Sequence, residues 1–157
     1  MDLQIREASH ADFLGWRDMA VDYDPGVAPI VESAWQRFHS KSDPYICLLA
    51  VCDGRVAGFA HYTFHDFCFG RGLTCYVSDL YVSPEFRRRG IARALLAHLC
   101  ELGKSSGWGR IYWVTDHRNP ARALYDEVGN AEFVRYHLDL DAAFHQRPSE
   151  ASQCPTT

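Results

Sequence analysis

The sequence predicts a single α/β (α+β) domain in which a mixed sheet of six to seven strands is flanked by about four helices. Strand-like and helix-like segments alternate along the chain, with no repeat, interdomain linker or low-complexity segment between them. The length of 157 residues is that of one domain. We expect this domain to span residues 1–140, and the polar, proline-bearing residues 141–157 to form a frayed tail.

The first part of the chain is predicted to form a strand and two helices. Residues 3–6 alternate between apolar and polar side chains, which is the pattern of a strand. Apolar side chains then recur at helical spacing over residues 9–23 and again over residues 28–39. The segment Asp24-Pro25-Gly26 breaks the helical pattern between them.

Three strands are predicted next. Residues 45–51 form a continuous apolar run, and Asp53-Gly54 is typical of a hairpin turn that leads into a return strand over residues 55–65. A glycine-rich turn then precedes a strand over residues 73–82.

Helices and strands alternate in the last part of the chain. A segment rich in alanine and leucine predicts a helix over residues 88–102, and residues 110–115 predict a strand. Asn119-Pro120 places an N-cap residue before a proline, which predicts a helix that runs to about Val128. The last strand is predicted over residues 133–140.

Charge is distributed unevenly along the chain. The net charge is −4, but residues 1–53 carry a net charge of −5 and residues 54–138 carry +3. The basic middle part suggests a phosphate-bearing ligand, and the acidic first part suggests a cationic one. A solvated surface of uneven charge explains the same pattern.

Several functional classes are disfavoured. No apolar run has the length of a membrane helix, and the N-terminus lacks the pattern of a secretory signal, so we expect a cytoplasmic protein. The cysteines form no Cys-x-x-Cys pair and have no suitably spaced histidines, so we expect reduced thiols and no metal site. The sequence has no extended basic face with interleaved aromatic residues, so a nucleic-acid partner is disfavoured.

The segment after the strand over residues 73–82 carries the strongest functional signal. A short turn containing three arginines leads into a helix that opens with the small residues Gly90 and Ala92. Unpaired backbone N–H groups and the positive end of the helix dipole meet at such a helix start and favour an anion. Small residues let phosphate oxygens approach the backbone closely. A dinucleotide-binding loop is disfavoured, because no Gly-x-Gly-x-x-Gly follows a strand.

Two blocks of sequence stand in a characteristic order. The first is Arg87-x-x-Gly90-x-Ala92 after the strand Asp-Leu-Tyr-Val-x-Pro, and the second is residues 111–115 followed by residues 121–126. In this order they resemble the coenzyme A pyrophosphate motif and the next strand and helix of the GNAT acetyltransferase superfamily. The resemblance covers roughly residues 3–140 and is greatest to the histone/polyamine (fungal-type) acetyltransferase-like branch.

The resemblance implies an acetyl-CoA site where two neighbouring parallel strands splay apart, here the fourth and fifth. It implies that the backbone of Leu80 and Val82 pairs with the acetyl and pantetheine groups. Tyr125 matches the general acid that protonates the departing thiolate, and it also lies against the cofactor. The residues implied to hold the pyrophosphate are Arg87, Arg88, Arg89, Gly90, Ala92 and Arg93.

One position departs from the family pattern. The family places an asparagine seven residues before the tyrosine, whereas Asn119 stands six before Tyr125 and therefore lies about 120° off that helix face. Either Asn119 reaches the pantetheine by another geometry or Arg118 has replaced it, and we favour Asn119.

The general base is not singled out by the sequence. Asp79 is the first candidate, because strand alternation points it away from the face of Leu80 and Val82 and because a carboxylate within an apolar strand needs a partner or a task. Tyr81 shares the face of Asp79. The other candidates are His61, His65, Asp66, Asp116 and His117.

These features together predict an acetyl-CoA-dependent N-acetyltransferase that acts by direct attack in a ternary complex. The acidic helices favour a small polyamine or amino-acid-like amine, and Trp16, Tyr23 and Trp35 form either an aromatic wall or ordinary core. A protein lysine or N-terminal acetyltransferase and a non-catalytic acyl-CoA-binding regulatory module are the alternatives. The resemblance also suggests a homodimer, and neither a nucleic acid nor a membrane is an expected partner.

Overall fold

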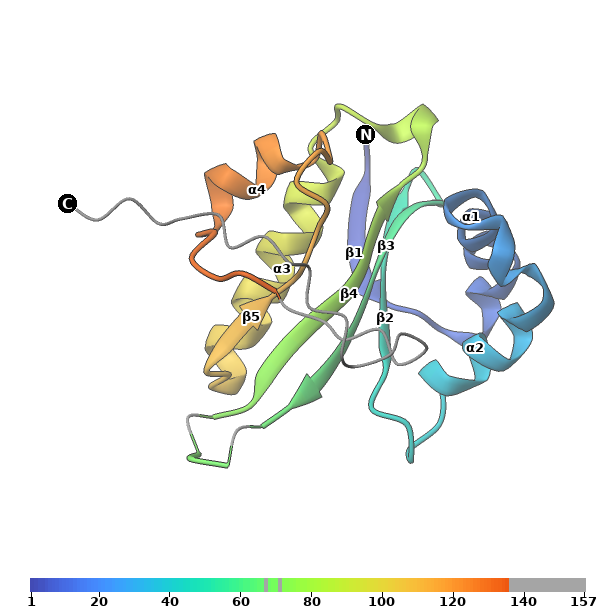
Figure 1. Cartoon of the computed structure of the whole chain (residues 1–157). Coiled ribbons are helices and arrows are strands. Elements are labelled where there is room, and N and C mark those ends of the chain that lie inside the picture. Colours follow the sequence, from blue (N-terminus) through green and yellow to red (C-terminus); the bar gives the residue numbers. More distant parts are fainter. Residues whose placement is uncertain (67, 71, 136–157) are drawn as a thin grey trace, which may run out of the picture.

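A central sheet with helices on both faces makes up the part of the chain that the structure describes, residues 1–66, 68–70 and 72–135 of a computed structural model (Figure 1). Helices within residues 13–38 cover one face, and helices within residues 91–128 lie on the other (Figure 1). The predicted tail over residues 141–157 lies outside the described residues.

The sheet has five strands in the order in which they follow one another along the chain. The first four are antiparallel, and the fifth runs parallel to the fourth, so the mixed sheet and the α/β class are confirmed. Residues 133–135 of the predicted last strand do not pair, and the rest of that strand lies outside the described residues, which leaves five strands instead of six to seven. The strands are β1 (Leu3–Glu7), β2 (Ile46–Cys52), β3 (Arg55–His65), β4 (Thr74–Val82) and β5 (Arg110–Tyr112).

The helices agree with the predicted segments but begin later. The four helices are α1 (Phe13–Tyr23), α2 (Val31–Phe38), α3 (Ile91–Ser106) and α4 (Arg122–Val128). Three 3-10 turns precede α1, α2 and α3, namely η1 (His10–Asp12), η2 (Pro25–Ile30) and η3 (Pro84–Phe86). Two prolines lie within η2, and because proline lacks an N–H donor this segment stays outside the regular α-helix.

Each face of the sheet has its own apolar core. Under α3, Leu95 and Leu99 are fully buried against inward-facing residues of β2, β3 and β4. On the other face, Trp16 of α1 and Trp35 of α2 are buried against Phe59 and other residues of the sheet. The helical stripes seen in the sequence therefore pack on opposite faces of one sheet.

The described residues contain five cysteines, of which three are buried. Cys47, Cys52 and Cys75 are buried, Cys68 and Cys100 are exposed, and all five are free thiols. Burial raises the pKa of the Cys75 thiol to about 12, which keeps this thiol unreactive at neutral pH.

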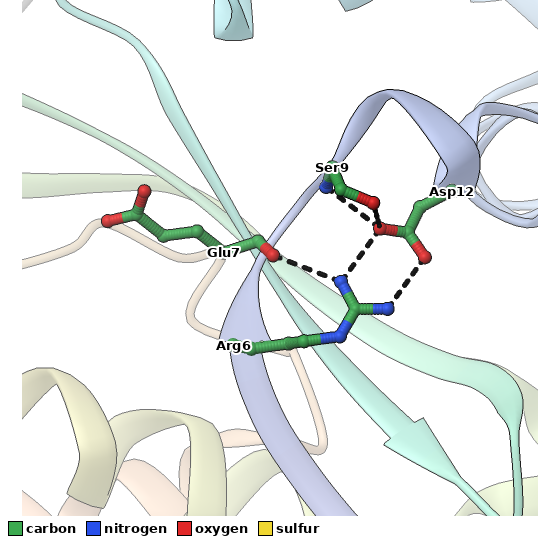
Figure 2. A network of polar contacts seen from close by, with 4 residues as sticks. All are labelled: Arg6, Glu7, Ser9 and Asp12. Carbon is green, nitrogen blue, oxygen red and sulfur yellow. Dashed lines mark hydrogen bonds and ion pairs between the residues drawn. The ribbon is translucent and has the colours of Figure 1, made fainter.

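An ion-pair network holds β1 to the start of α1 (Figure 2). The two terminal nitrogens of Arg6 each donate to a carboxylate oxygen of Asp12 at 2.7 Å, and the Ser9 backbone N–H and hydroxyl also donate to Asp12. The hydrogen bonds from Arg6 outweigh the effect of burial and hold the pKa of Asp12 far below its usual range. The network sets the direction in which the chain enters α1.

We expect Asp12→Ala to lower the free energy of unfolding by about 1.5–3 kcal/mol, because it removes charge-assisted hydrogen bonds from a half-buried guanidinium. Urea unfolding at pH 7 measures the loss. Since the folded-state pKa of Asp12 is lowered, its contribution is complete above the ordinary carboxyl pKa of about 4 and declines as the pH falls below it. The difference between variant and wild type should therefore shrink in acid.

Asp18→Ala is the matched control, because Asp18 pairs with Arg17 at the surface with 68% of its side chain exposed. We expect this change to alter the unfolding free energy by less than about 0.5 kcal/mol. Equal losses in the two variants would contradict the structural role given to Asp12.

Candidate active site

Strands β4 and β5 separate soon after they pair. Their parallel register runs from Thr74 beside Arg110 to Tyr76 beside Tyr112, where β5 ends. Strand β4 continues to Val82 without a β5 partner, so the predicted splay between the fourth and fifth strands is confirmed. The strand predicted over residues 110–115 is correspondingly shorter.

The free edge of β4 presents the backbone of alternate residues. Ser83 N donates to Ala57 O of β3 at 3.1 Å, so the backbone groups of Leu80 and Val82 point to the opposite, open edge. Within the structure, Arg87 Nε donates to Val82 O at 3.0 Å. The side chains of Leu80 and Val82 pack in the core under α3, so backbone and side chain act independently.

A bulge in β4 determines the direction of Asp79. His61 of β3 lies beside Asp79, but the next pair joins Tyr62 to Val77, which leaves Ser78 as an extra residue. Val77 and Leu80 therefore both belong to the core under α3, although they are three residues apart. Beyond the bulge, Asp79 and Tyr81 face α1.

The start of α3 forms a concave backbone surface. Arg88 has φ of +61° and Gly90 has φ of +79°, two left-handed residues that end the preceding turn and delay the helix from the predicted residue 88 to Ile91. Ala94 N donates to Gly90 O at 2.9 Å, so the N–H groups of residues 91–93 precede the first helical bond. No described atom lies within 4 Å of a Cβ built on Gly90, so the surface is open to an anion.

The arginines near this surface differ in their contacts. Besides its bond to Val82 O, Arg87 lies over the ring of Tyr81, and Arg89 lies over the ring of Phe86. Arg93 forms an ion pair with Glu127, which joins the first turn of α3 to α4. Arg88 and Ala92 complete the predicted set: Arg88 is exposed and Ala92 is half-buried.

Tyr125 is held at the start of α4. Its ring packs edge-to-face on Trp113 with 5.4 Å between the ring centroids, and Trp113 in turn packs on Gly129. Burial raises the pKa of the Tyr125 phenol, so it stays protonated at neutral pH.

The side chain of Asn119 caps the turn before α4. Its Oδ1 accepts the N–H of Ala121 at 2.9 Å, and its Nδ2 donates to Thr115 at 2.8 Å. The helix therefore begins at Arg122, three residues after Asn119. Arg118, the alternative to Asn119, is 81% exposed at the side chain and bonds to Asp116.

Asp79 accepts hydrogen bonds from three side chains. His61 Nδ1 lies 3.1 Å and Ser78 Oγ lies 2.8 Å from Asp79 Oδ2, and the Tyr23 hydroxyl donates to Asp79 Oδ1 at 3.3 Å. Burial alone would raise the pKa of Asp79, but the hydrogen bonds outweigh it and the net shift is downward. Asp79 is therefore an anion at neutral pH and 32% of its side chain remains exposed.

Tyr23 of α1 donates a hydrogen bond to Asp79 from the other side of the site. Burial, the negative charge of Asp79 and, to a lesser extent, Tyr125 raise the pKa of Tyr23 to about 12. The Tyr23 hydroxyl therefore stays protonated at neutral pH and supports the negative charge of Asp79.

Behind Asp79, the structure places a second polar chain that the sequence did not reveal. The indole Nε1 of Trp16 donates to His61 Nε2 at 2.9 Å, and the His61 ring is stacked on Phe59 with 4.3 Å between centroids. Trp16 fits a helical apolar stripe, so its pattern indicated only a core residue. No spacing in the sequence pairs it with His61, 45 residues later.

The other candidates for the base lie elsewhere. His65 bonds to the hydroxyl of Tyr112, where β4 and β5 are still paired. Asp116 and His117 lie together in an exposed turn, where Asp116 bonds to Arg118. Tyr81 shares the Asp79 face, as predicted, and its hydroxyl donates to Asp22 of α1.

The described part of the chain has neither a metal-binding group nor a membrane-spanning helix. Among residues 1–66, 68–70 and 72–135, no three histidine, cysteine or acidic side chains come together as a metal-binding group. No helix in that part of the chain has the length and apolar character needed to cross a bilayer.

Comparison with known proteins gives a consistent result. The sequence model of the Acetyltransferase (GNAT) family matches residues 6–129. The chain is 37% identical over 76 residues to the D-amino-acid N-acetyltransferase HPA3 of Saccharomyces cerevisiae, a match that covers 48% of this chain and 47% of the relative. It is 45% identical over 58 residues to the thialysine N-epsilon-acetyltransferase of Caenorhabditis elegans, with 36% of each chain covered. These matches span half or less of the two curated relatives.

Solved structures share the fold over most of the chain. A complex of AAC(6')-Iy with the bisubstrate analogue CoA-S-monomethyl-acetylneamine superposes with a TM-score of 0.72, covering 88% of this chain and 99% of the other, at 21% identity. At this identity the likeness concerns the fold alone. The splayed strands, the open start of α3 and the polar cluster around Asp79 thus occur in a fold that has been solved with a coenzyme A analogue.

Proposed function

Because this chain belongs to the acetyltransferase (GNAT) family, we propose that it transfers the acetyl group of acetyl-CoA to a primary amine of a small cationic molecule. The observation that carries the proposal is the unpaired edge of β4 between the open start of α3 and Tyr125. A thioester bound along this edge has backbone donors and acceptors on one side and a phenol near its sulfur. The relatives named for amino-acid and thialysine acetylation support an amine as the acceptor.

For the cofactor, the proposal assigns the pyrophosphate to the first turn of α3. The N–H groups of residues 91–93 and the left-handed Arg88 and Gly90 make this surface suitable for phosphate oxygens. Arg87, Arg88 and Arg89 add positive charge around it. The pantetheine amides pair with the backbone of Leu80 and Val82 along the open edge of β4, and Arg87 gives up its bond to Val82 O where the pantetheine takes this carbonyl.

For the amine, the proposal assigns the anionic Asp79. An amine of pKa about 10.4 is neutral in only about one molecule in 2,500 at pH 7, so the substrate arrives as a cation. A carboxylate whose charge is held by three hydrogen bonds attracts and orients it. Asp22, which bonds to Tyr81 on the same face, adds to the negative field.

The transfer then follows from the two ends of the site. The bound ammonium first loses one proton to solvent water, which leaves a neutral amine. Its nitrogen attacks the thioester carbonyl, and the N–C bond forms as the C–S bond breaks. The attacking nitrogen becomes strongly acidic and passes its proton to Asp79, while Tyr125 donates the phenolic proton to the departing thiolate. The amine attacks the thioester directly in a ternary complex. A covalent acetyl-cysteine intermediate is not part of the proposal, because no described cysteine lies among the proposed site residues.

We assign Asn119 a supporting role for the cofactor. The two hydrogen bonds of its side chain hold the turn between Thr115 and α4, the helix that carries Tyr125. The second hydrogen of its amide nitrogen can be donated to the pantetheine. The homodimer and the cytoplasmic location remain predictions. Size-exclusion chromatography with light scattering tests the first of them.

Two measurements test the proposed activity. Calorimetry should detect binding of acetyl-CoA in the absence of an amine, and coenzyme A release, corrected for hydrolysis, should then depend on the amine. The amine panel contains spermidine, a lysine analogue, a D-amino acid and a basic peptide. We expect the small amines to be acetylated faster than the peptide.

Each alternative has its own outcome. Binding of acetyl-CoA without consumption by any amine would favour a regulatory module, and preference for the peptide would favour a protein acetyltransferase. No binding of acetyl-CoA would remove the basis of the proposal.

A further inference from the structure

Three residues far apart in the sequence form one hydrogen-bonded chain. Trp16 Nε1 bonds to His61 Nε2 at 2.9 Å, and His61 Nδ1 bonds to Asp79 Oδ2 at 3.1 Å. Trp16 is 2% exposed, and the His61 side chain is 12% exposed. This series of hydrogen bonds thus runs from the core under α1 to the partly exposed carboxylate of Asp79.

The chemistry of the donors determines where the His61 proton lies. An indole nitrogen can only donate, so His61 Nε2 must accept and carries no proton in this arrangement. The proton of the neutral imidazole is therefore on Nδ1, from which it is donated to Asp79. A second proton on Nε2 would face the indole N–H and break the bond to Trp16.

The ring of His61 cannot turn to another partner. It is stacked on Phe59 at 4.3 Å and packed against Phe38 at 4.8 Å between centroids. Three titratable groups face these residues: Asp79 of β4, Tyr23 of α1 and the buried Cys47 of β2, which lies opposite His61. Burial raises the pKa of the Cys47 thiol, so it is neutral, and Phe38, Phe59 and Trp16 carry no charge. The tautomer is thus set from both ends, because Trp16 donates to Nε2 and the Asp79 carboxylate accepts from Nδ1. Trp16 alone keeps a second proton off Nε2.

We propose that Trp16 is a positioning residue: its indole N–H occupies His61 Nε2, keeps the imidazole neutral with its one proton on Nδ1, and so leaves the charge of Asp79 free for the amine. This inference rests on the proposed function for the role of Asp79, although the tautomer itself does not depend on it. Without the indole donor, His61 is free to bind a proton on Nε2. A charged His61 would pair with Asp79 and compete with the cationic substrate.

The test compares Trp16→Phe with Trp35→Phe. Trp35 is a second buried tryptophan that packs on Trp16 with 4.9 Å between centroids, so its replacement controls for loss of aromatic packing. Nitrogen-15 spectra of the histidine rings at pH 7 report which nitrogen of His61 carries the proton, without any turnover. Steady-state kinetics from pH 5.5 to 8 then give KM for the amine and kcat separately.

In wild type and Trp35→Phe, we expect an unprotonated Nε2 and a protonated Nδ1. In Trp16→Phe, we expect the Nε2 signal to move toward that of a protonated nitrogen, and KM for the amine to rise by about tenfold. The rise should be larger at pH 5.5 than at pH 8, with a smaller effect on kcat.

Adding His61→Asn to Trp16→Phe should remove this pH dependence, because the asparagine amide donates from the position of Nδ1 but does not titrate. His61→Gln, whose donor lies one bond further out, should not replace it.

The outcomes distinguish the role of Trp16 from the proposed function. A wild-type His61 with its proton on Nε2, or the same spectra and amine KM in Trp16→Phe as in Trp35→Phe, would overturn the inference. Altered His61 spectra in Trp16→Phe without acetylation by any variant would support the tautomer chain and contradict the proposed function instead.

Discussion

Tyr125→Phe is expected to lower kcat by about 10²–10⁴-fold while changing the Kd for acetyl-CoA little. The phenol has no task in the ground state that phenylalanine cannot perform, because its ring packing on Trp113 is kept. Its hydroxyl is needed when the thiolate leaves. Because burial raises its pKa, the hydroxyl is protonated and ready to donate throughout the neutral range. Stopped-flow or steady-state release of coenzyme A gives kcat, and calorimetry gives Kd.

Tyr45→Phe is the control for this measurement. Tyr45 stands just before β2, and its ring packs against the guanidinium of Arg37 of α2, 4.1 Å from the ring centroid. We expect both constants to stay near the wild-type values in this variant. If Tyr125→Phe weakened acetyl-CoA binding as much as it lowered turnover, Tyr125 would be a binding residue and the assignment as general acid would be wrong.

Asp79→Asn is expected to lower kcat/KM for the amine by about 100-fold or more. The asparagine keeps the size of the side chain but loses the charge that attracts the ammonium, and its amide hydrogens face the donors of His61, Ser78 or Tyr23. Binding of acetyl-CoA should persist, since Asp79 contributes only its side chain to the opposite face of the strand from Leu80 and Val82. Initial rates over a range of amine concentrations measure the change.

Glu101→Gln removes the same charge from an exposed position on α3, where Glu101 pairs with Lys104. It should leave kcat/KM nearly unchanged, which separates the local role of Asp79 from the net charge of the protein. A loss in Asp79→Asn no greater than that in Glu101→Gln would exclude Asp79 from amine binding and from the base role.

The fold followed from local patterns because most of its elements are locally specified. Local patterns predict these elements: helical apolar stripes mark α1, α2 and α3, and apolar runs mark β2 and β4. The Asp53-Gly54 turn joins β2 to β3. The errors fall at boundaries: Arg88 and Gly90 adopt left-handed conformations that delay α3, and bonds from residues 122–124 to the carbonyls three residues earlier form a tighter turn ahead of α4. These depend on dihedral angles and on hydrogen bonds, which a hydrophobic pattern does not encode.

The base could not be selected from the sequence, because five residues besides Asp79 and Tyr81 were comparable by type and spacing. The structure separates them by distance. His61 supports Asp79, His65 bonds to Tyr112, and Asp116 bonds to Arg118 in an exposed turn. The bulge at Ser78, which no alternation pattern marks, is what turns Asp79 toward Tyr23 and α1.

By itself, the sequence determined the order of strands and helices, the family and the segment that is suited to phosphate, because these features depend on residues close together along the chain. Only the tertiary structure decided which distant side chains meet: Trp16 with His61, His61 with Asp79, and Asp79 with Tyr23. These contacts arise where a helix packs on a sheet whose strands come from other parts of the chain. Their partners are therefore set by packing and register, quantities that one-dimensional spacing does not contain.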